Sequence, residues 1–415
     1  MINDKINKMP NIPFTQNKWF RFTLSLPILI ILIGSTSCSR SLNTSNSSTS
    51  RYSVFFDAGS SGTRVYIYEI TPSTYPQSFP IIDQAPASTS LSEEKWSLKV
   101  TPGISTFTTN LDGISGYLKP LIDFVKIKIA DPIELRITPA FLKATAGMRL
   151  LPSPDQQNII TKAKDALLQS GFYLNSSSSV EVISGADEGL YSWITVNYLS
   201  KAFDLGASAT YGIIELGGAS LQITFVPEHP PTSDSKIVTL GKNTYNLYSK
   251  SYTGFGLNSA RGSFNSDICN YVNSTSPSFA ACKTSILSHF STSCNIGQDS
   301  CGFDQEYQPP LFGDFYGLSS IYHIPNTSSI ETSPLAISSL SSQGATVCSS
   351  LTISSSNACF DLAYLDALLT GNGAPQSDGF GFLPSTTNKI YSAIKLQNRE
   401  LNFTFGAAIL EAYKY

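Results

Sequence analysis

The sequence predicts an α/β protein of two domains, and three observations support this prediction. The chain has 415 residues, of which 41% are hydrophobic, and this length is more than one hydrophobic core usually serves. Apolar, β-branched runs alternate with patterns of helical period between residues 52 and 225. A plan of strand, carboxylate, Gly/Ser turn and strand occurs twice, at residues 52–68 and 211–225. We therefore expect two α/β domains of roughly 100–200 residues each.

The charge of the chain excludes one class of partner. Only 14% of the residues are charged, and the formal net charge is −3. Binding to nucleic acid needs a basic surface that neutralises phosphates. We therefore expect no nucleic-acid partner.

Residues 1–38 are expected to form a secretory signal. Basic residues precede an apolar run at residues 23–34, which is shorter than the roughly 20 residues that a membrane-spanning helix needs. Small residues then lead to Cys38 in a faint likeness to a bacterial lipoprotein cleavage site. Residues 39–50 are rich in Ser, Thr and Asn and are expected to be a tether. The mature chain is expected to be exported without a transmembrane anchor, as a secreted or periplasmic protein, and a lipid anchor at Cys38 is left open.

Residues 52–68 have the pattern of a β-hairpin with a tip the size of a phosphate. An apolar run ends at Asp57, passes through a Gly/Ser turn, and continues after Thr63 as a second alternating run. Gly59 and Gly62 would let backbone N–H groups approach an anion, while Asp57 would face the accompanying cation. An ordinary hairpin turn is the alternative for this stretch alone.

The segment that follows alternates strand and helix. Residues 134–138 and 141–145 are expected near a strand and its end, residues 153–169 form a helix, and residues 180–184 form a short buried strand. A helix follows directly, and Glu188 lies in its first turn. On its own, Glu188 is better explained as a complement to the helix dipole.

Residues 211–225 repeat the plan of the first hairpin. The carboxylate is now Glu215, and the turn runs through Gly217, Gly218 and Ala219 to Ser220. Two such hairpins that face each other across a cleft would hold a phosphate chain from both sides.

Cysteine usage agrees with export. Apart from Cys38, six cysteines remain in the second half of the chain: Cys269, Cys282, Cys294, Cys301, Cys348 and Cys359. An even number in an exported chain predicts disulfides. Cys348 and Cys359 are isolated from the others and are expected to pair, while the other four allow three connectivities among themselves. A zinc site is the alternative, but the chain has no C-x-x-C pair and only three histidines.

Two further helices are expected towards the C-terminus. Residues 360–369 have an amphipathic helical pattern after Cys359, and residues 401–413 have the pattern of a turn that leads into a closing helix.

Four segments resemble, in order, the apyrase conserved regions of the nucleoside triphosphate diphosphohydrolase family, in a soluble member of bacterial type. They are residues 57–63, 143–152, 185–198 and 215–222. Each motif alone is weak, but four in the family's order are specific, and the resemblance runs from about Tyr52 to the C-terminus.

The resemblance implies a fold of two RNase H-like domains of the actin, Hsp70 and sugar-kinase type, with the active site in the cleft between them. Domain I would comprise residues 51–184 and 394–415. Domain II would comprise residues 185–393 and carry the disulfides.

The activity that the resemblance implies is extracytoplasmic hydrolysis of nucleoside tri- and diphosphates to monophosphate and phosphate, with Mg²⁺ or Ca²⁺. Two alternatives are another phosphatase or phosphotransferase of this fold, such as a polyphosphatase or a kinase, and a non-catalytic nucleotide-binding module. The signal argues against a kinase, because ATP is scarce outside the cytosol, and the disulfide pattern argues against the module.

Roles follow from the same resemblance. Glu188 matches the catalytic base that activates the attacking water. Ser220 and Gln222 match residues that hold this water and the hydration shell of the metal, and Thr145 matches a residue that lines the same water site. Phosphate contacts are implied for Ser60, Ser61, Gly62, Thr63, Ala146, Gly217, Gly218 and Ala219.

The remaining roles concern the metal cation and the nucleobase. Asp57 and Glu215 match carboxylates that hold the cation largely through water, as suits Mg²⁺. The family usually has Asp where this chain has Glu215, so the metal preference or the rate is expected to differ. Tyr322 is the candidate platform for the nucleobase, with a core aromatic as the alternative.

Overall fold

The computed structural model describes residues 51–73, 75, 78–85, 96–174, 176–271, 275–290, 302–350, 357–373 and 379–413. The expected signal and tether, together with Cys294 and Cys301, lie outside these residues. The described residues belong to one compact unit, Ser48–Tyr415. No helix among them is long and apolar enough to cross a membrane.

The first sheet carries the first hairpin. Its strands are β1 (Arg51–Ala58), β2 (Thr63–Thr71), β3 (Ile81–Gln84), β4 (Ser97–Val100), β5 (Ala140–Ala144) and β6 (Val180–Val182). The order is β3-β2-β1-β5-β6, and β4 also pairs with β2. Strand β1 is antiparallel to β2, as the hairpin prediction requires, and parallel to β5. The carboxyl ends of β1 and β5 therefore meet at one edge of the sheet.

Alternation along β1 divides its side chains between two cores. Val54 and Phe56 pack with helices α1 (Gly113–Lys128) and α4 (Ser153–Gln169) on one face of the sheet. Phe55 points to the opposite face and joins a different core. Because successive side chains of a strand point to opposite faces, both faces of this sheet are covered.

The second sheet carries the second hairpin. Its strands are β7 (Gly212–Leu216), β8 (Ser220–Phe225), β9 (Ser235–Leu240), β10 (Asn243–Thr253), β11 (Phe315–Ser319) and β12 (Ile390–Ser392). The order is β12-β11-β7-β8-β10-β9. Strands β7 and β8 form the predicted antiparallel hairpin, with Glu215 opposite Gln222.

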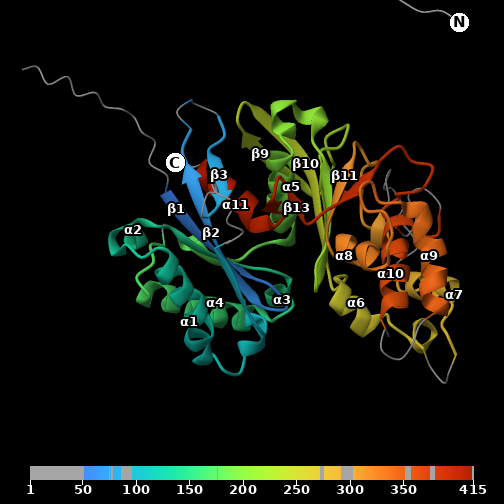
Figure 1. The fold of residues 1–415 in the computed structure, drawn as a ribbon, viewed down its shortest axis with the longest axis horizontal. Helices are drawn as coiled ribbons and strands as arrows, with labels where there is room; N and C mark the ends of the chain where they lie inside the picture. The colour runs from blue at the N-terminus through green and yellow to red at the C-terminus, as the bar shows by residue number, and fades with distance from the viewer. Residues whose placement is uncertain are drawn as a thin grey trace, which may run out of the picture. The chain divides into compact units, whose positions relative to one another are not determined.

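Two helices fill the space between the sheets (Figure 1). Helix α5 (Gly185–Leu199) packs on β7, β8 and β10, and helix α11 (Phe403–Ala412) packs on α5, β1 and β2. One hydrophobic cluster accordingly joins Phe55 of the first sheet, Ile213 of the second, Trp193 of α5 and Phe405 of α11. The position of α5 relative to both hairpins is therefore fixed by shared packing. The limits of the two predicted domains stay a prediction.

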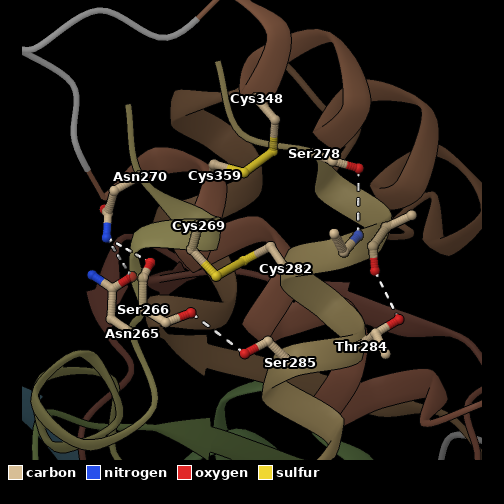
Figure 2. The surroundings of a disulfide bond; sticks show 12 residues. Asn265, Ser266, Cys269, Asn270, Ser278, Cys282, Thr284, Ser285, Cys348 and Cys359 are labelled. Carbon is tan, nitrogen blue, oxygen red and sulfur yellow. Dashed lines mark hydrogen bonds between the residues drawn. A yellow bond between two sulfur atoms is a disulfide. The ribbon is translucent and has the colours of Figure 1, made fainter. Parts of the chain in front are cut away.

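A helical layer that contains the disulfides covers the other face of the second sheet (Figure 1). Its helices are α6 (Leu257–Ser263), α7 (Phe279–Leu287), α8 (Ser320–Thr327), α9 (Ile337–Ser349) and α10 (Ala358–Thr370). Cys348 and Cys359 form the predicted disulfide, and Cys269 pairs with Cys282, as Figure 2 shows.

The amphipathic pattern expected at residues 360–369 is wrong. Helix α10 is buried on nearly all sides, because α7, α8 and α9 surround it. A helix enclosed in this way is apolar all round rather than along one stripe.

The strand expected near residues 134–138 is also wrong, because this segment forms α2 (Pro132–Ile137). Pro132 occupies the first helical position, and the side chain of Asp131 accepts a hydrogen bond from Ile133 N at 2.8 Å. These are two strong signals for a helix start. The strand begins later, at β5. The predictions of α4, of β6 and of Glu188 in the first turn of α5 are confirmed.

Three further short elements complete the α-helices and strands of the described residues. They are α3 (Ala146–Arg149), β13 (Lys395–Leu396) and β14 (Arg399–Glu400).

The crossing of α5 and α11 depends on a residue without a side chain. A Cβ added at Gly406 would collide with the carbonyl of Tyr191 and would lie 2.9 Å from Thr195 Oγ1. We predict that Gly406→Ala lowers the free energy of unfolding by ~1–3 kcal/mol, because overpacking forces the helices apart. Gly116→Ala is the matched control: Gly116 lies in α1 with open space around it, so this change should stabilise by ~0.5–1 kcal/mol. Urea unfolding of both variants measures the difference, and equal effects would contradict the importance of this crossing.

Candidate active site

The tips of the two hairpins lie against each other. A Cβ added at Gly218, in the second tip, would lie only 2.8 Å from Ser60 Oγ in the first tip. A Cβ added at Gly147 in α3 would likewise lie 2.8 Å from Ser60 Cα. Three of the four sequence segments therefore meet at Ser60, and glycine is needed where they approach.

The other predicted phosphate contacts lie at or beside these tips. Ser61 is exposed, and Lys99 Nζ of β4 donates to its hydroxyl at 3.3 Å. Thr63 is fully buried, and its hydroxyl lies 2.9 Å from the hydroxyl of Tyr117. Thr145 precedes α3, and its backbone N–H donates to Ala58 O at 3.2 Å. The ammonium group of Lys99 therefore lies beside the first tip, and sequence reasoning missed this residue.

Glu188 is held by groups from two other elements. Arg149 Nη2 donates to Glu188 Oε2 at 2.8 Å and to Ser220 Oγ at 3.1 Å. Gln222 Nε2 lies 3.2 Å from Glu188 Oε2 and 2.6 Å from Ser220 Oγ. The Glu188 side chain is only 12% exposed, so these contacts fix its direction. Three of the four residues predicted to handle the attacking water, Glu188, Ser220 and Gln222, thus form one network, and these hydrogen bonds do not include Thr145.

Local structure explains why Glu188 lies in the first turn of α5. Ser184 is the N-cap of α5, and its hydroxyl accepts a hydrogen bond from Asp187 N at 3.1 Å. Strand β6 ends two residues before, next to β5, so the first turn of α5 lies at the sheet edge where β1 also ends. Carboxylates are favourable at a helix N-terminus, and here one of them also points into the site.

Glu215 is enclosed by hydroxyl groups. Ser192 Oγ of α5 donates to Glu215 Oε2 at 2.6 Å, and Ser319 Oγ donates to Glu215 Oε1 at 3.1 Å. Burial raises the pKa of the Glu215 carboxyl, and these two hydrogen bonds oppose the rise.

Three carboxyl groups repel one another in this site. Burial raises the pKa of Asp57 to about 7, with the charges of Glu188 and Glu215 adding to the rise and Arg64 opposing it. Burial also raises the pKa of Glu188 to about 7, while Arg149 opposes and Glu215 adds to the shift. Burial is thus the main cause of both shifts, and the charges of neighbouring carboxylates add to it.

A cavity of about 310 Å³ opens beside these carboxylates. It is lined by Asp57, Arg64, Tyr66, Glu215, Ser319, His323, Ile394, Lys395, Glu400, Leu401, Asn402 and Phe403. The described residues include no group of three or more His, Cys, Asp or Glu side chains placed to hold a metal ion directly. Two buried carboxylates, Asp57 and Glu215, at this cavity fit a hydrated hard cation that keeps most of its water ligands.

Tyr322 is not among the described residues that line this cavity. It lies in α8, half-buried, with its ring 5.5 Å from the ring of His323, and it is His323 that reaches the cavity. The role of Tyr322 as a platform for the base stays a prediction.

Besides Lys99, sequence reasoning missed four residues of the site. Arg149 lies inside one of the four recognised segments, and Ser192 follows Glu188 by one helical turn, so both had a local signal. Arg64 had a signal in its place opposite Asp57 in the first hairpin. Ser319 had none, because it reaches Glu215 only through the pairing of β11 with β7.

Comparisons with known proteins identify the family of the chain. The profile of the GDA1/CD39 (nucleoside phosphatase) family matches residues 43–275. Probable apyrase 3 of Arabidopsis thaliana is 39% identical over 227 residues, which cover 54% of this chain and 44% of that protein. Nucleoside diphosphate phosphatase ENTPD5 of Homo sapiens is 29% identical over 396 residues, with 87% of both chains covered. The chain thus spans about half the length of the plant relatives that it matches.

A solved structure also shares the fold. The crystal structure of nucleoside triphosphate hydrolases from Neospora caninum matches with a TM-score of 0.62 at 15% identity, covering 88% of this chain and 93% of that one. The predicted α/β fold of the actin type is confirmed.

Proposed function

Since the chain belongs to the GDA1/CD39 (nucleoside phosphatase) family, we propose that it hydrolyses nucleoside tri- and diphosphates to the monophosphate and phosphate. One observation carries the proposal. Arg149 and Gln222 hold Glu188 of α5 close to Ser220 of the second hairpin. The tip of this hairpin contacts the tip of the first hairpin at Ser60. A base, its hydrogen-bonded partners and two anion-binding tips are what attack of water on a phosphoryl group requires.

The tips would bind the phosphate chain. Backbone N–H groups at Ser60, Ser61 and Gly62 on one side, and at Gly218 on the other, would donate to phosphate oxygens. The N–H of Gly217 donates to Ser220 O at 3.0 Å, so Gly217 would contribute to phosphate binding by allowing a close approach of the backbone. Ala146 and Ala219 extend these two sets of donors. Donors fixed before the reaction stabilise the charge that develops on the oxygens.

Asp57 and Glu215 would hold the cation largely through water. The family depends on divalent cations in general, and Mg²⁺ or Ca²⁺ is our proposal for this chain, because carboxylate and water oxygens suit both. When bound, such an ion neutralises negative charge on the phosphate chain.

Glu188 would take the proton of the attacking water. A base is most effective when its pKa lies near the working pH, and the pKa of Glu188 is about 7. Ser220 and Gln222 would orient the same water, and Thr145 would line its site. Of these groups, Gln222 contacts Glu188 directly and Ser220 contacts Gln222.

The proposal also covers the contact with the nucleobase and the export of the protein. Tyr322 would stack on the nucleobase, and because any base has a flat face, such stacking favours broad specificity. The two disulfides, Cys269–Cys282 and Cys348–Cys359, support an exported protein, because such bonds persist in oxidising compartments.

Glu188→Ala tests the activity directly. We predict that the wild type releases phosphate from both ATP and ADP with Mg²⁺, and that the variant loses at least ~100-fold in kcat, the contribution of a general base. Glu134→Ala is the matched control, because Glu134 also lies in the first turn of a helix, α2, but away from the site. It should stay within ~2-fold of the wild type. No release from either nucleotide by the wild type would refute the proposed activity, and full activity of Glu188→Ala would refute the base.

Arg149 is predicted to set the pH dependence. Ionised Glu188 is the active form, so activity should rise as the pH increases through the pKa of Glu188. Arg149 lowers this pKa, so Arg149→Met should move the acid limb of kcat/KM to higher pH by ~1 unit or more. Arg149→Lys keeps the charge and should move it less.

Lys236→Met is the control for this prediction. Lys236 Nζ pairs with Asp187, the neighbour of Glu188, at 2.8 Å. Its loss should leave the acid limb in place. A limb that stays unchanged in Arg149→Met, or that moves equally in Lys236→Met, would contradict the assigned role of Arg149.

A further inference from the structure

Glu215 receives one hydroxyl on each carboxylate oxygen, and the two hydroxyls come from different parts of the fold. Ser192 belongs to α5 and donates to Oε2 at 2.6 Å, while Ser319 ends β11 and donates to Oε1 at 3.1 Å. An ionised carboxylate offers about four acceptor positions. The two hydroxyls use one position on each oxygen, and the other two remain for groups in the cavity that Glu215 lines.

Ser192 links Glu215 to the base. It is fully buried and lies four residues after Glu188 in α5, so both side chains leave the same face of one helix. Any movement of α5 therefore shifts Glu188 and the donor to Glu215 together. The helix sets the position of the base relative to the cation carboxylate.

Ser319 has a conformation and a partner that its place in the helix does not explain. It is the N-cap of α8 with φ 57° and ψ −120°, a region that residues with a side chain rarely adopt. A serine at an N-cap usually accepts a hydrogen bond from the first turn, but the side chain of Ser319 makes no such bond. Its hydroxyl donates to Glu215 instead. Glycine would relieve the backbone there but would remove the donor.

The length of Glu215 explains the need for two donors. Glutamate has one more side-chain torsion than aspartate, so fixing its carboxylate costs more conformational entropy. Two donors from separate elements determine both the direction and the rotation of the carboxylate. Hydrogen bonds to an ionised group are the strong ones.

We propose that Ser192 and Ser319 are positioning residues that fix the carboxylate of Glu215 for a hydrated divalent cation. This inference rests on the proposed function, in which Glu215 holds that cation. In this proposal the two serines act on the cation through Glu215. Partners of this kind typically contribute 10–100-fold to metal affinity.

Cation binding to the full chain without nucleotide is the primary test. After removal of bound metal with a chelator, titration with Mg²⁺ or with Ca²⁺ alone, followed by calorimetry, gives the affinity of each variant. Ser192→Ala and Ser319→Ala should each weaken binding by ~10-fold. Ser249→Ala is the matched control, because this buried serine also contacts α5, through Ala186 O at 2.9 Å, but not Glu215. An equal loss in Ser249→Ala, or no loss in Ser192→Ala, would overturn the proposal.

The shorter carboxylate provides an internal check. In a Glu215→Asp background, the side chain no longer reaches both hydroxyls, so Ser192→Ala should cost less than ~2-fold in cation affinity there. The ratio of Mg²⁺ to Ca²⁺ affinity should also change in Glu215→Asp. If Ser192→Ala costs the same ~10-fold in both backgrounds, its effect does not pass through Glu215, and the proposal fails.

Two variants of Ser319 separate the effect of its hydroxyl from the effect of its backbone conformation. Ser319→Ala and Ser319→Gly both remove the donor, but only glycine relieves the positive φ. The two variants should differ in thermal stability and agree in cation affinity. If the affinities follow the stabilities instead, Ser319 acts through the backbone and not through its hydroxyl.

Failure of this inference and failure of the proposed function give different results. A wild type that binds cation in a manner that depends on Ser192, yet releases no phosphate from ATP or ADP, would retain the inference and refute the activity. A wild type that hydrolyses both nucleotides, with cation affinity unchanged in Ser192→Ala, would refute the inference alone.

Discussion

Burial of three carboxyl groups in one site is the constraint on which the rest of the structure depends. Asp57, Glu188 and Glu215 come from the first hairpin, the helix between the hairpins and the second hairpin. Burial and mutual charge raise the pKa of Asp57 and of Glu188 to about 7. Bringing these groups together lowers the free energy of unfolding, and it creates the site at which we propose that a cation and a phosphate chain bind.

Hydrophobic packing elsewhere in the fold holds this arrangement in place. Helices α5 and α11 share one hydrophobic cluster with both sheets, so the hairpins are fixed relative to the helix that carries Glu188. Contacts through glycine at Gly218 and Gly406 let backbone segments approach where side chains would not fit. Each of these two carboxylates has its own hydrogen-bond donors: Arg149 donates to Glu188, and two serines donate to Glu215.

Local signals in the sequence predicted the parts of the site, and contacts between distant residues completed it. Both hairpins and the place of Glu188 were predictable, because turn residues and helical spacing are local. The contact of Ser319 with Glu215 joins residues 104 positions apart, so no local pattern indicates it. The burial of helix α10 on nearly all sides depends on neighbouring helices, so the local pattern of residues 360–369 does not indicate it. The start of α2 is different, because Asp131 and Pro132 are a local capping signal.

The most direct test of this account is the thermal stability of Asp57→Asn and of the wild type at pH 8, each with a chelator and with excess Mg²⁺. Asparagine has the shape of aspartate without its charge. The account predicts that the variant is more stable than the wild type without cation, because one of three repelling charges is removed, and that Mg²⁺ stabilises only the wild type. A wild type indifferent to Mg²⁺, or a variant less stable than the wild type without cation, would contradict it.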